Sequence, residues 1–235
     1  MNHSFPIVAA LLILACRGAA TELPFSEEET LHYNINWPSG LSLGECVMTA
    51  KLVRSGEDQP PRWTFELRMD AAVPGFQVQN HFRSSATADL CSLEFEKTAT
   101  HGNRKAKEKT VFDAAAGVAT RETRGGGKSD MPIPRCPRDA LVFLYHLRHE
   151  LSEGRLPAPQ TVFFGAPYEI SFRYAGTKDV RIGETRQTAD QLAAEVKGPA
   201  SEHTFELLFS QDEGRQPLRI TVPLELGSFT MELAP

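Results

Sequence analysis

The chain has 235 residues, and 41% of them are hydrophobic, which is enough to bury one large core. Its formal net charge is −5, from 25 basic and 30 acidic residues, and the two signs are interleaved along the chain. Because a protein that binds phosphate backbones needs a basic face, this composition argues against nucleic acid as a partner.

The N-terminus has the layout of a secretory signal peptide over residues 1–20. An unbroken apolar run covers residues 5–15, and Gly18 and Ala20 supply the small residues of a cleavage site. We therefore expect export, to the periplasm or out of the cell, with a lipid anchor on Cys16 as the alternative route. The run is shorter than the roughly 20 residues of a membrane-spanning helix, and no later segment is longer. No transmembrane segment is expected after removal of the signal.

Strand patterns dominate the rest of the chain. Leu31, Tyr33, Ile35 and Trp37 alternate with polar residues, as in a half-buried strand. The same alternation recurs in later segments: 63–69, 76–79, 91–96, 168–174, 204–210, 218–222 and 229–233. Short turns join these segments, so consecutive strands are expected to be antiparallel neighbours.

A meander of about a dozen strands is too long to lie flat, so it is expected to form a strongly curved sheet or an open barrel. No linker divides the chain, and residues 21–235 are predicted to form one mainly β domain. The densest basic stretch, residues 104–109, is expected to be the solvated end of a hairpin.

One segment has helical spacing. Apolar residues between Asp139 and Leu151 predict one amphipathic helix over about residues 138–151, and Pro137 suits its first turn. The simplest place for a lone helix beside a curved sheet is the concave face. Residues 189–196 fit a second short helix about as well as a strand.

Export makes disulfides stable, so the cysteines are considered as pairs. Cleavage after Ala20 leaves Cys46, Cys91 and Cys136, and the sequence allows three pairings. We favour Cys91 with Cys136, since Cys136 lies just before the helix and a bond there would attach the helix to a strand. Cys46 falls within a strand pattern, where a buried free thiol is ordinary.

Motifs of catalysis and metal binding are weak. His146, His149 and Glu150 follow the order His-x-x-His-Glu, which differs from the metalloprotease motifs, so no metal ligand is assigned. No phosphate-binding glycine loop or Ser-x-x-Lys box is present in the sequence. The sequence predicts no catalytic residue and no cofactor, and we expect the protein not to be an enzyme.

Three residues are candidates for ligand binding. Tyr145 and Arg148 lie three apart on the predicted helix and could aim a polar pair into a cavity, and Trp37 joins them as an aromatic candidate. The alternative is that Tyr145 packs in the core and Arg148 pairs with an acidic residue from a strand.

The spacing of several residues resembles the domain of unknown function 3108 family of exported bacterial envelope proteins. The residues that carry the resemblance are Leu31, Tyr33, Ile35, Trp37, Gly40, Leu41, Gly44, Glu45, Cys136, Asp139, Tyr145, Arg148, Asp212, Arg215, Pro217, Arg219 and Ile220. The likeness runs from about Leu31 to Leu233. It implies a mainly β envelope protein with no assigned activity and no catalytic residue to transfer. Pro38-Ser39 and Cys46 depart from the family pattern.

The sequence is compatible with three classes of function. The first is binding of an apolar or lipid-like ligand, since the aromatic and aliphatic strand residues could line a cavity. The second is a structural or interaction protein of the envelope, which would hold a protein partner through sheet edges or a loop such as residues 122–135. The third is an enzyme acting on glycans, for which the sequence offers no positive sign.

Overall fold

The computed structural model describes residues 23–37, 39–56, 59–73, 75–199, 202–224 and 227–235. The predicted signal peptide, including Cys16, lies outside these ranges. Within them the chain forms one β-sheet of fifteen strands and one α-helix, α1 (Ala140–Ser152).

The helix divides the strands into two groups. The strands before it are β1 (Glu28–Asn36), β2 (Ser42–Val53), β3 (Arg62–Val73), β4 (Phe76–Thr87), β5 (Ser92–His101), β6 (Arg104–Asp113), β7 (Val118–Thr123), β8 (Lys128–Pro132) and β9 (Arg138–Asp139). The strands after it are β10 (Gln160–Phe163), β11 (Pro167–Ile182), β12 (Thr185–Lys197), β13 (Glu202–Ser210), β14 (Pro217–Leu224) and β15 (Gly227–Leu233).

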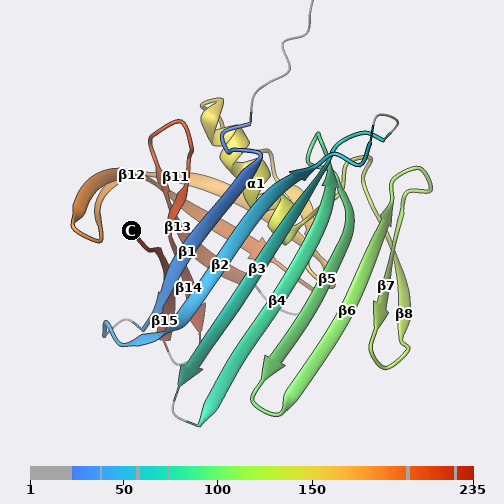
Figure 1. Cartoon of the computed structure of the whole chain (residues 1–235), viewed down its shortest axis with the longest axis horizontal. Coiled ribbons are helices and arrows are strands. Elements are labelled where there is room, and N and C mark those ends of the chain that lie inside the picture. The colour runs from blue at the N-terminus through green and yellow to red at the C-terminus, as the bar shows by residue number, and fades with distance from the viewer. Residues whose placement is uncertain (1–22, 38, 57–58, 74, 200–201, 225–226) are drawn as a thin grey trace, which may run out of the picture.

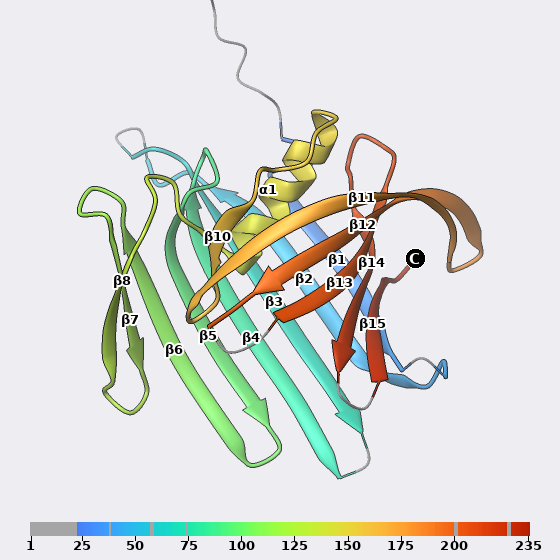
Figure 2. The same ribbon diagram turned by 180° about the vertical axis from the view of Figure 1, so that it is seen from behind.

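The sheet is strongly curved and open. Its order is β8-β7-β6-β5-β4-β3-β2-β1-β15-β14-β13-β12-β11-β10-β9, so the first and last strands of the chain pair in its interior. The short β9–β10 pair is parallel, and the other pairs are antiparallel. Strands β10–β13 cross behind β1–β5 in Figure 1 and in front of them in Figure 2, which is the view from the other side, and α1 lies between the two layers. The predicted curved sheet with a helix on its concave face is confirmed, and within the described ranges the sheet does not close into a barrel.

Residue alternation decides which side chains face the concave side. In β1, Leu31, Tyr33 and Ile35 are buried, whereas the residues between them are exposed. Their cross-strand neighbours in β2 are buried too, with Cys46 opposite Tyr33 and Met48 opposite Leu31. The core therefore follows the concave face from strand to strand, and Cys46 is the buried free thiol that the sequence predicted.

Two segments differ from the sequence expectations or resolve an open choice. Residues 189–196 lie in β12 and form no helix. Residues 122–135, expected to be a loop, contain the turn and second strand of the β7–β8 hairpin. These residues are mostly polar and exposed, but backbone hydrogen bonds between strands need no apolar side chains.

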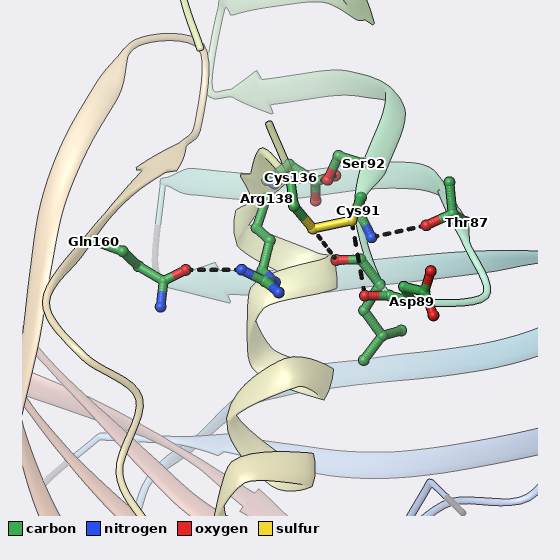
Figure 3. The surroundings of a disulfide bond; sticks show 9 residues. Thr87, Asp89, Cys91, Ser92, Cys136, Arg138 and Gln160 are labelled. Atoms are coloured by element: carbon green, nitrogen blue, oxygen red, sulfur yellow. Dashed lines mark hydrogen bonds between the residues drawn. A yellow bond between two sulfur atoms is a disulfide. The ribbon is translucent and has the colours of Figure 1, made fainter. Parts of the chain in front are cut away.

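A disulfide anchors the start of the helix, as predicted. Cys91 at the start of β5 is bonded to Cys136, and their Cα atoms are 4.8 Å apart (Figure 3). Beside it, the Ser92 N–H donates to the Pro137 carbonyl at 2.8 Å. The segment that leads into α1 is thus held to the middle of the first strand group by a covalent bond and by hydrogen bonds.

Candidate functional site

An apolar cavity of about 400 Å³ lies between α1 and strands β10–β14. We call it the α1 cavity. Its lining is aliphatic and aromatic except for one imidazole and one phenol: Ala140, Phe143, Leu144, Leu147, Val162, Phe164, Tyr168, Ile170, Phe172, Ala194, Val196, His203, Phe205, Leu207 and Ile220. A cavity of this volume, lined by apolar side chains with a few polar groups, is typical of small-molecule binding sites.

Strand register builds the sheet side of this cavity. Phe172 of β11 pairs with Ala194 of β12, which pairs with Phe205 of β13. Because directly opposed residues of an antiparallel sheet point to the same face, these three side chains form one row on the concave side. Leu207 and Ile220, paired between β13 and β14, extend the apolar surface by a further row.

The helix supplies the opposite wall. Leu144 and Leu147, three residues apart, lie on one side of α1 and line the cavity. Leu141 and Tyr145 belong to the core cluster that α1 forms with β1–β5. A helix that packs on both sides must be apolar around most of its circumference, and α1 has buried residues on both of these sides.

The cavity is accessible from solvent. Phe164, Phe172 and Phe205 are only half-buried although they face the inside of the curved sheet. At one side Tyr168 packs against Gly198, where an added Cβ would lie 2.4 Å from the tyrosine ring. Glycine at this position therefore allows the Tyr168 ring to rest directly on the backbone after β12.

Arg148 and Tyr145, two of the three predicted ligand-binding residues, are packed in the interior. Arg148 is 1% exposed and donates to the Glu29 carboxylate from Nη1 and Nη2, at 2.6 and 2.9 Å. It also donates to the Gly214 carbonyl from Nε and Nη2, at 3.1 and 2.7 Å. Its guanidinium lies over the Phe25 and Tyr145 rings, 5.2 Å from each centroid.

This is the ion-paired arrangement that the sequence analysis gave as the alternative. Burial raises the pKa of Tyr145, so its hydroxyl stays neutral. Neither Tyr145 nor Arg148 lines the α1 cavity, and the positions of these side chains do not support a direct ligand contact. Together they tie α1 to β1 and to the turn between β13 and β14.

Trp37, the third predicted residue, lies just after β1 in the connection to β2. Its backbone N–H donates to the Leu41 carbonyl at 2.8 Å, and its carbonyl accepts from the Gly40 N–H at 2.8 Å. The indole is half-buried and does not line the α1 cavity. The structure therefore does not bring Trp37 together with the other two residues at the cavity.

A buried carboxyl group positions the helix. Asp139 is fully buried, caps α1 through the Leu141 and Val142 N–H groups at 2.9 and 3.2 Å, and accepts from the Ser84 and Ser92 hydroxyls at 2.7 Å each. Burial raises the pKa of Asp139 to about 6, against the opposing effect of these hydrogen bonds. The acid is enclosed by strands and helix and serves as an internal anchor.

Among the described residues, no three or more His, Cys, Asp and Glu side chains are grouped closely enough to hold a metal ion. No helix in the same ranges is long and apolar enough to cross a membrane.

The sequence does not distinguish apolar strand residues that line a cavity from those that fill the core. The alternation in residues 168–174 and 204–210 identified which residues share a face of the sheet. However, an apolar face covered by other side chains and an apolar face that borders a cavity have the same sequence pattern. Only the distance at which α1 packs from the later strands distinguishes the two. No sequence signal marked Phe143 or Leu144 as cavity residues.

The fold and the cavity define a class of protein: an open, barrel-like sheet with one helix on its concave face and an apolar cavity beside that helix. A similar structure is the crystal structure of a beta-barrel-like protein of domain of unknown function DUF1849 from Brucella abortus. The TM-score is 0.60 at 8% identity, and the match covers 88% of this chain and 95% of that chain. At this identity the likeness concerns the fold alone.

The chain belongs to the family described as "Protein of unknown function (DUF3108)", whose model matches residues 30–234. The resemblance noted in the sequence is thereby confirmed over nearly the span expected for it. No curated protein matches the chain.

Proposed function

We propose that this protein binds the apolar part of a lipid-like ligand in the α1 cavity and carries out no reaction on it. The observation that carries the proposal is the set of half-exposed aromatic side chains on the concave face, Phe164, Phe172 and Phe205. Burying such surface is worth about 25 cal/mol per Å², so an apolar ligand gains affinity wherever it covers these rings. The lining offers only His203 and Tyr168 as polar side chains, which suits binding better than catalysis.

The proposal includes a place in the cell envelope. The first twenty residues have the pattern of a signal peptide. The Cys91–Cys136 bond fits an oxidising compartment, because disulfides are rare in the cytosol. An exported binding protein for lipid-like molecules agrees with both features.

The test compares two tryptophan substitutions at neighbouring positions of β12. Val196 is half-buried and lines the cavity, whereas Glu195 is exposed on the opposite face. Binding of N-phenyl-1-naphthylamine is followed by the rise of its fluorescence in apolar surroundings. We expect V196W to weaken dye binding about tenfold or more, since the indole occupies space otherwise open to the dye, and E195W to bind like the original chain.

A second variant keeps the test valid if V196W does not fold. Phe205→Ser removes apolar surface from the half-exposed wall instead of adding bulk, and it is expected to weaken the dye as well. Equal dye affinity in V196W, F205S and E195W would show that the dye binds elsewhere and would overturn the proposal.

One observation favours a second candidate, an interaction protein without a small ligand. β10 pairs with β11 only along residues 167–170, so in the described part of the chain residues 171–182 of β11 have a partner strand, β12, on one side only. Such an edge can accept a strand from another protein. However, Arg173, Lys178 and Arg181 lie along it and a bulge follows Tyr174, and charges and bulges are typical protections against strand pairing. This edge therefore gives weaker support than the cavity does.

A photo-crosslinking residue at Arg181 tests the second candidate in cells. A single envelope protein captured there would favour a protein partner. Native mass spectrometry that found a stoichiometric apolar adduct on the purified chain would favour the ligand.

A further inference from the structure

A second cavity, of about 690 Å³, lies at the far end of the first strand group. We call it the basic cavity. It is lined by Gly75, Phe76, Lys97, Ala99, His101, Gly102, Asn103, Arg104, Lys105 and Ala106. Three of these residues carry a positive charge and one is an imidazole, whereas none is acidic. The β3–β4 and β5–β6 hairpin ends that form it extend past strands β10–β13 (Figure 2).

Two of the three charged residues of this cavity, Lys97 and Arg104, lie on the concave face of the sheet. Lys97 shares its side of β5 with the buried residues Phe95 and Ala99. On β6, Arg104 lies on the same side as the buried Phe112. The ring centroids of Phe112 and Phe163 are 5.6 Å apart. The inner face that begins as an apolar core under α1 thus becomes basic toward its open end.

Lys97 has little compensation for its charge. Its cross-strand neighbour is Glu108, but the Glu108 carboxylate accepts a hydrogen bond from Arg121 Nε at 2.9 Å. Burial acts to raise the pKa of Glu108, yet this hydrogen bond and the nearby Lys97 ammonium outweigh burial and lower the pKa. One ionised carboxylate therefore faces two cations. Within the described residues, Lys97, Arg104 and Lys105 form no ion pair.

The two cavities meet at one pair of side chains. Lys97 lines the basic cavity, and its Nζ lies 4.4 Å from the centroid of the Phe164 ring. Phe164 lines the α1 cavity and also packs against Phe82 and Phe95, at 5.2 and 5.7 Å between ring centroids. Positive charge that is only partly compensated therefore lies one side chain away from the apolar site.

We propose that the ligand of this protein is an anionic amphiphile, whose chain occupies the α1 cavity and whose anionic head group contacts Lys97 and Arg104 in the basic cavity. This inference rests on the proposed function, since it assigns a head group to the ligand of that same site. A carboxylate and a phosphate share the required chemistry, because each accepts charge-assisted hydrogen bonds from ammonium and guanidinium groups. The exposed Phe76 ring, 46% accessible, and the alanine walls of the basic cavity suit the part of the chain next to the head.

The test uses three probes that separate charge from chain. Decanoate and decanol share one alkyl chain but only decanoate is charged, and both are titrated as competitors of N-phenyl-1-naphthylamine. Inorganic phosphate carries charge without a chain, and its binding is measured by calorimetry. We expect decanoate to bind about tenfold more tightly than decanol at low salt, because one hydrogen bond to a charged group is enough to account for a difference of this size. Added salt should reduce this ratio.

The variants are matched in charge change and differ in the face they alter. Lys97→Gln and Arg104→Gln each remove one inward cation, and each should lower the decanoate-to-decanol affinity ratio toward one. Lys107→Gln removes an exposed cation from the outer face of β6 and should leave the ratio unchanged. Since the ratio compares two probes in one variant, a general loss of stability does not mimic the effect.

The outcomes separate this inference from the proposed function. If neither decanoate nor decanol displaces the dye, the α1 cavity is not a ligand site and both proposals fail. Equal displacement by the two probes, or a ratio that K107Q lowers as much as K97Q, would overturn the head-group inference and leave apolar binding intact. Phosphate that binds alone as tightly as decanoate would make the basic cavity a free-anion site and would also overturn it.

Discussion

At the scale of single residues, the most consequential contact is the ion pair of Arg148 with Glu29. The guanidinium is almost completely buried, while the Glu29 side chain is 11% exposed. Four hydrogen bonds that the guanidinium donates to Glu29 and Gly214 compensate the loss of hydration. Removing one member of a buried ion pair leaves the other without compensation, which is more costly than the pair is stabilising.

We therefore expect Glu29→Gln to lower the free energy of unfolding by about 3 kcal/mol. The double variant R148M/E29Q should lose less than E29Q alone, because no buried charge is then left unpaired. Urea denaturation of both variants and of R148M completes a double-mutant cycle. The control is Glu28→Gln, which removes a carboxylate that is 75% exposed and pairs with Lys51; we expect a loss of under about 0.5 kcal/mol. Equal losses for E28Q and E29Q would contradict the prediction.

Asp139 makes stability depend on pH. Its pKa is raised from 3.8 to about 6 in the folded chain, so between these values the folded state holds its proton more firmly than the unfolded state does. The contribution of Asp139 to the free energy of unfolding is therefore greatest below about pH 4 and is lost as pH rises to about 6. Two pKa units correspond to at most about 3 kcal/mol.

The comparison with Asp139→Asn isolates this group from the other carboxyls. Urea denaturation at several pH values between 4 and 7 should show the advantage of the original chain over D139N shrinking as pH rises. A constant difference over that range would mean that Asp139 does not titrate there, and a growing one would mean that the pKa is lowered instead.

At the scale of elements, the attachment of α1 decides the shape of the cavity. The helix is fixed at its start by the Cys91–Cys136 bond and the Asp139 cap, and in its last turns by Arg148. The helix was predictable from its apolar run of helical period, but the sequence placed its start at about residue 138, with Pro137 at the first turn. In the structure Asp139 is the N-cap and α1 begins at Ala140. The strands were predictable from alternation, but residues 189–196 were ambiguous because Ala, Leu and Val fit either period. Pairing with β11 and β13 on both sides made this segment a strand.

Removal of the disulfide is expected to destabilise the chain by about 4 kcal/mol, the chain-entropy value for a loop of this length. The sequence separation of the two cysteines is 45. Thermal unfolding of C91S/C136S, compared with the original chain with and without reductant, measures the effect. Cys46→Ala serves as the control and should keep the full response to reductant, because Cys46 is a free thiol. An unchanged unfolding temperature in C91S/C136S would contradict the prediction.

At the scale of the whole molecule, the two strand groups meet along β1 and β15 and then diverge. The later group curls back until the β10–β11 turn reaches the earlier strands, where Gly165 approaches Glu108 so closely that a Cβ would lie 2.6 Å from its Oε2. This contact brings Phe164 beside Lys97. The adjacency of the apolar and basic cavities is thus a result of curvature, between residues that lie 67 positions apart and on different strand groups.

The sequence by itself determined the local periods: an alternation of two for the strands and a helical period for one segment. These follow from side-chain spacing along a backbone of known geometry. Tertiary structure alone decided that Arg148 would form a buried ion pair with Glu29, that Trp37 would lie away from the helix, and that one apolar face would stay partly open. Each depends on the curvature of the whole sheet and on how closely α1 packs against it, which no single segment encodes.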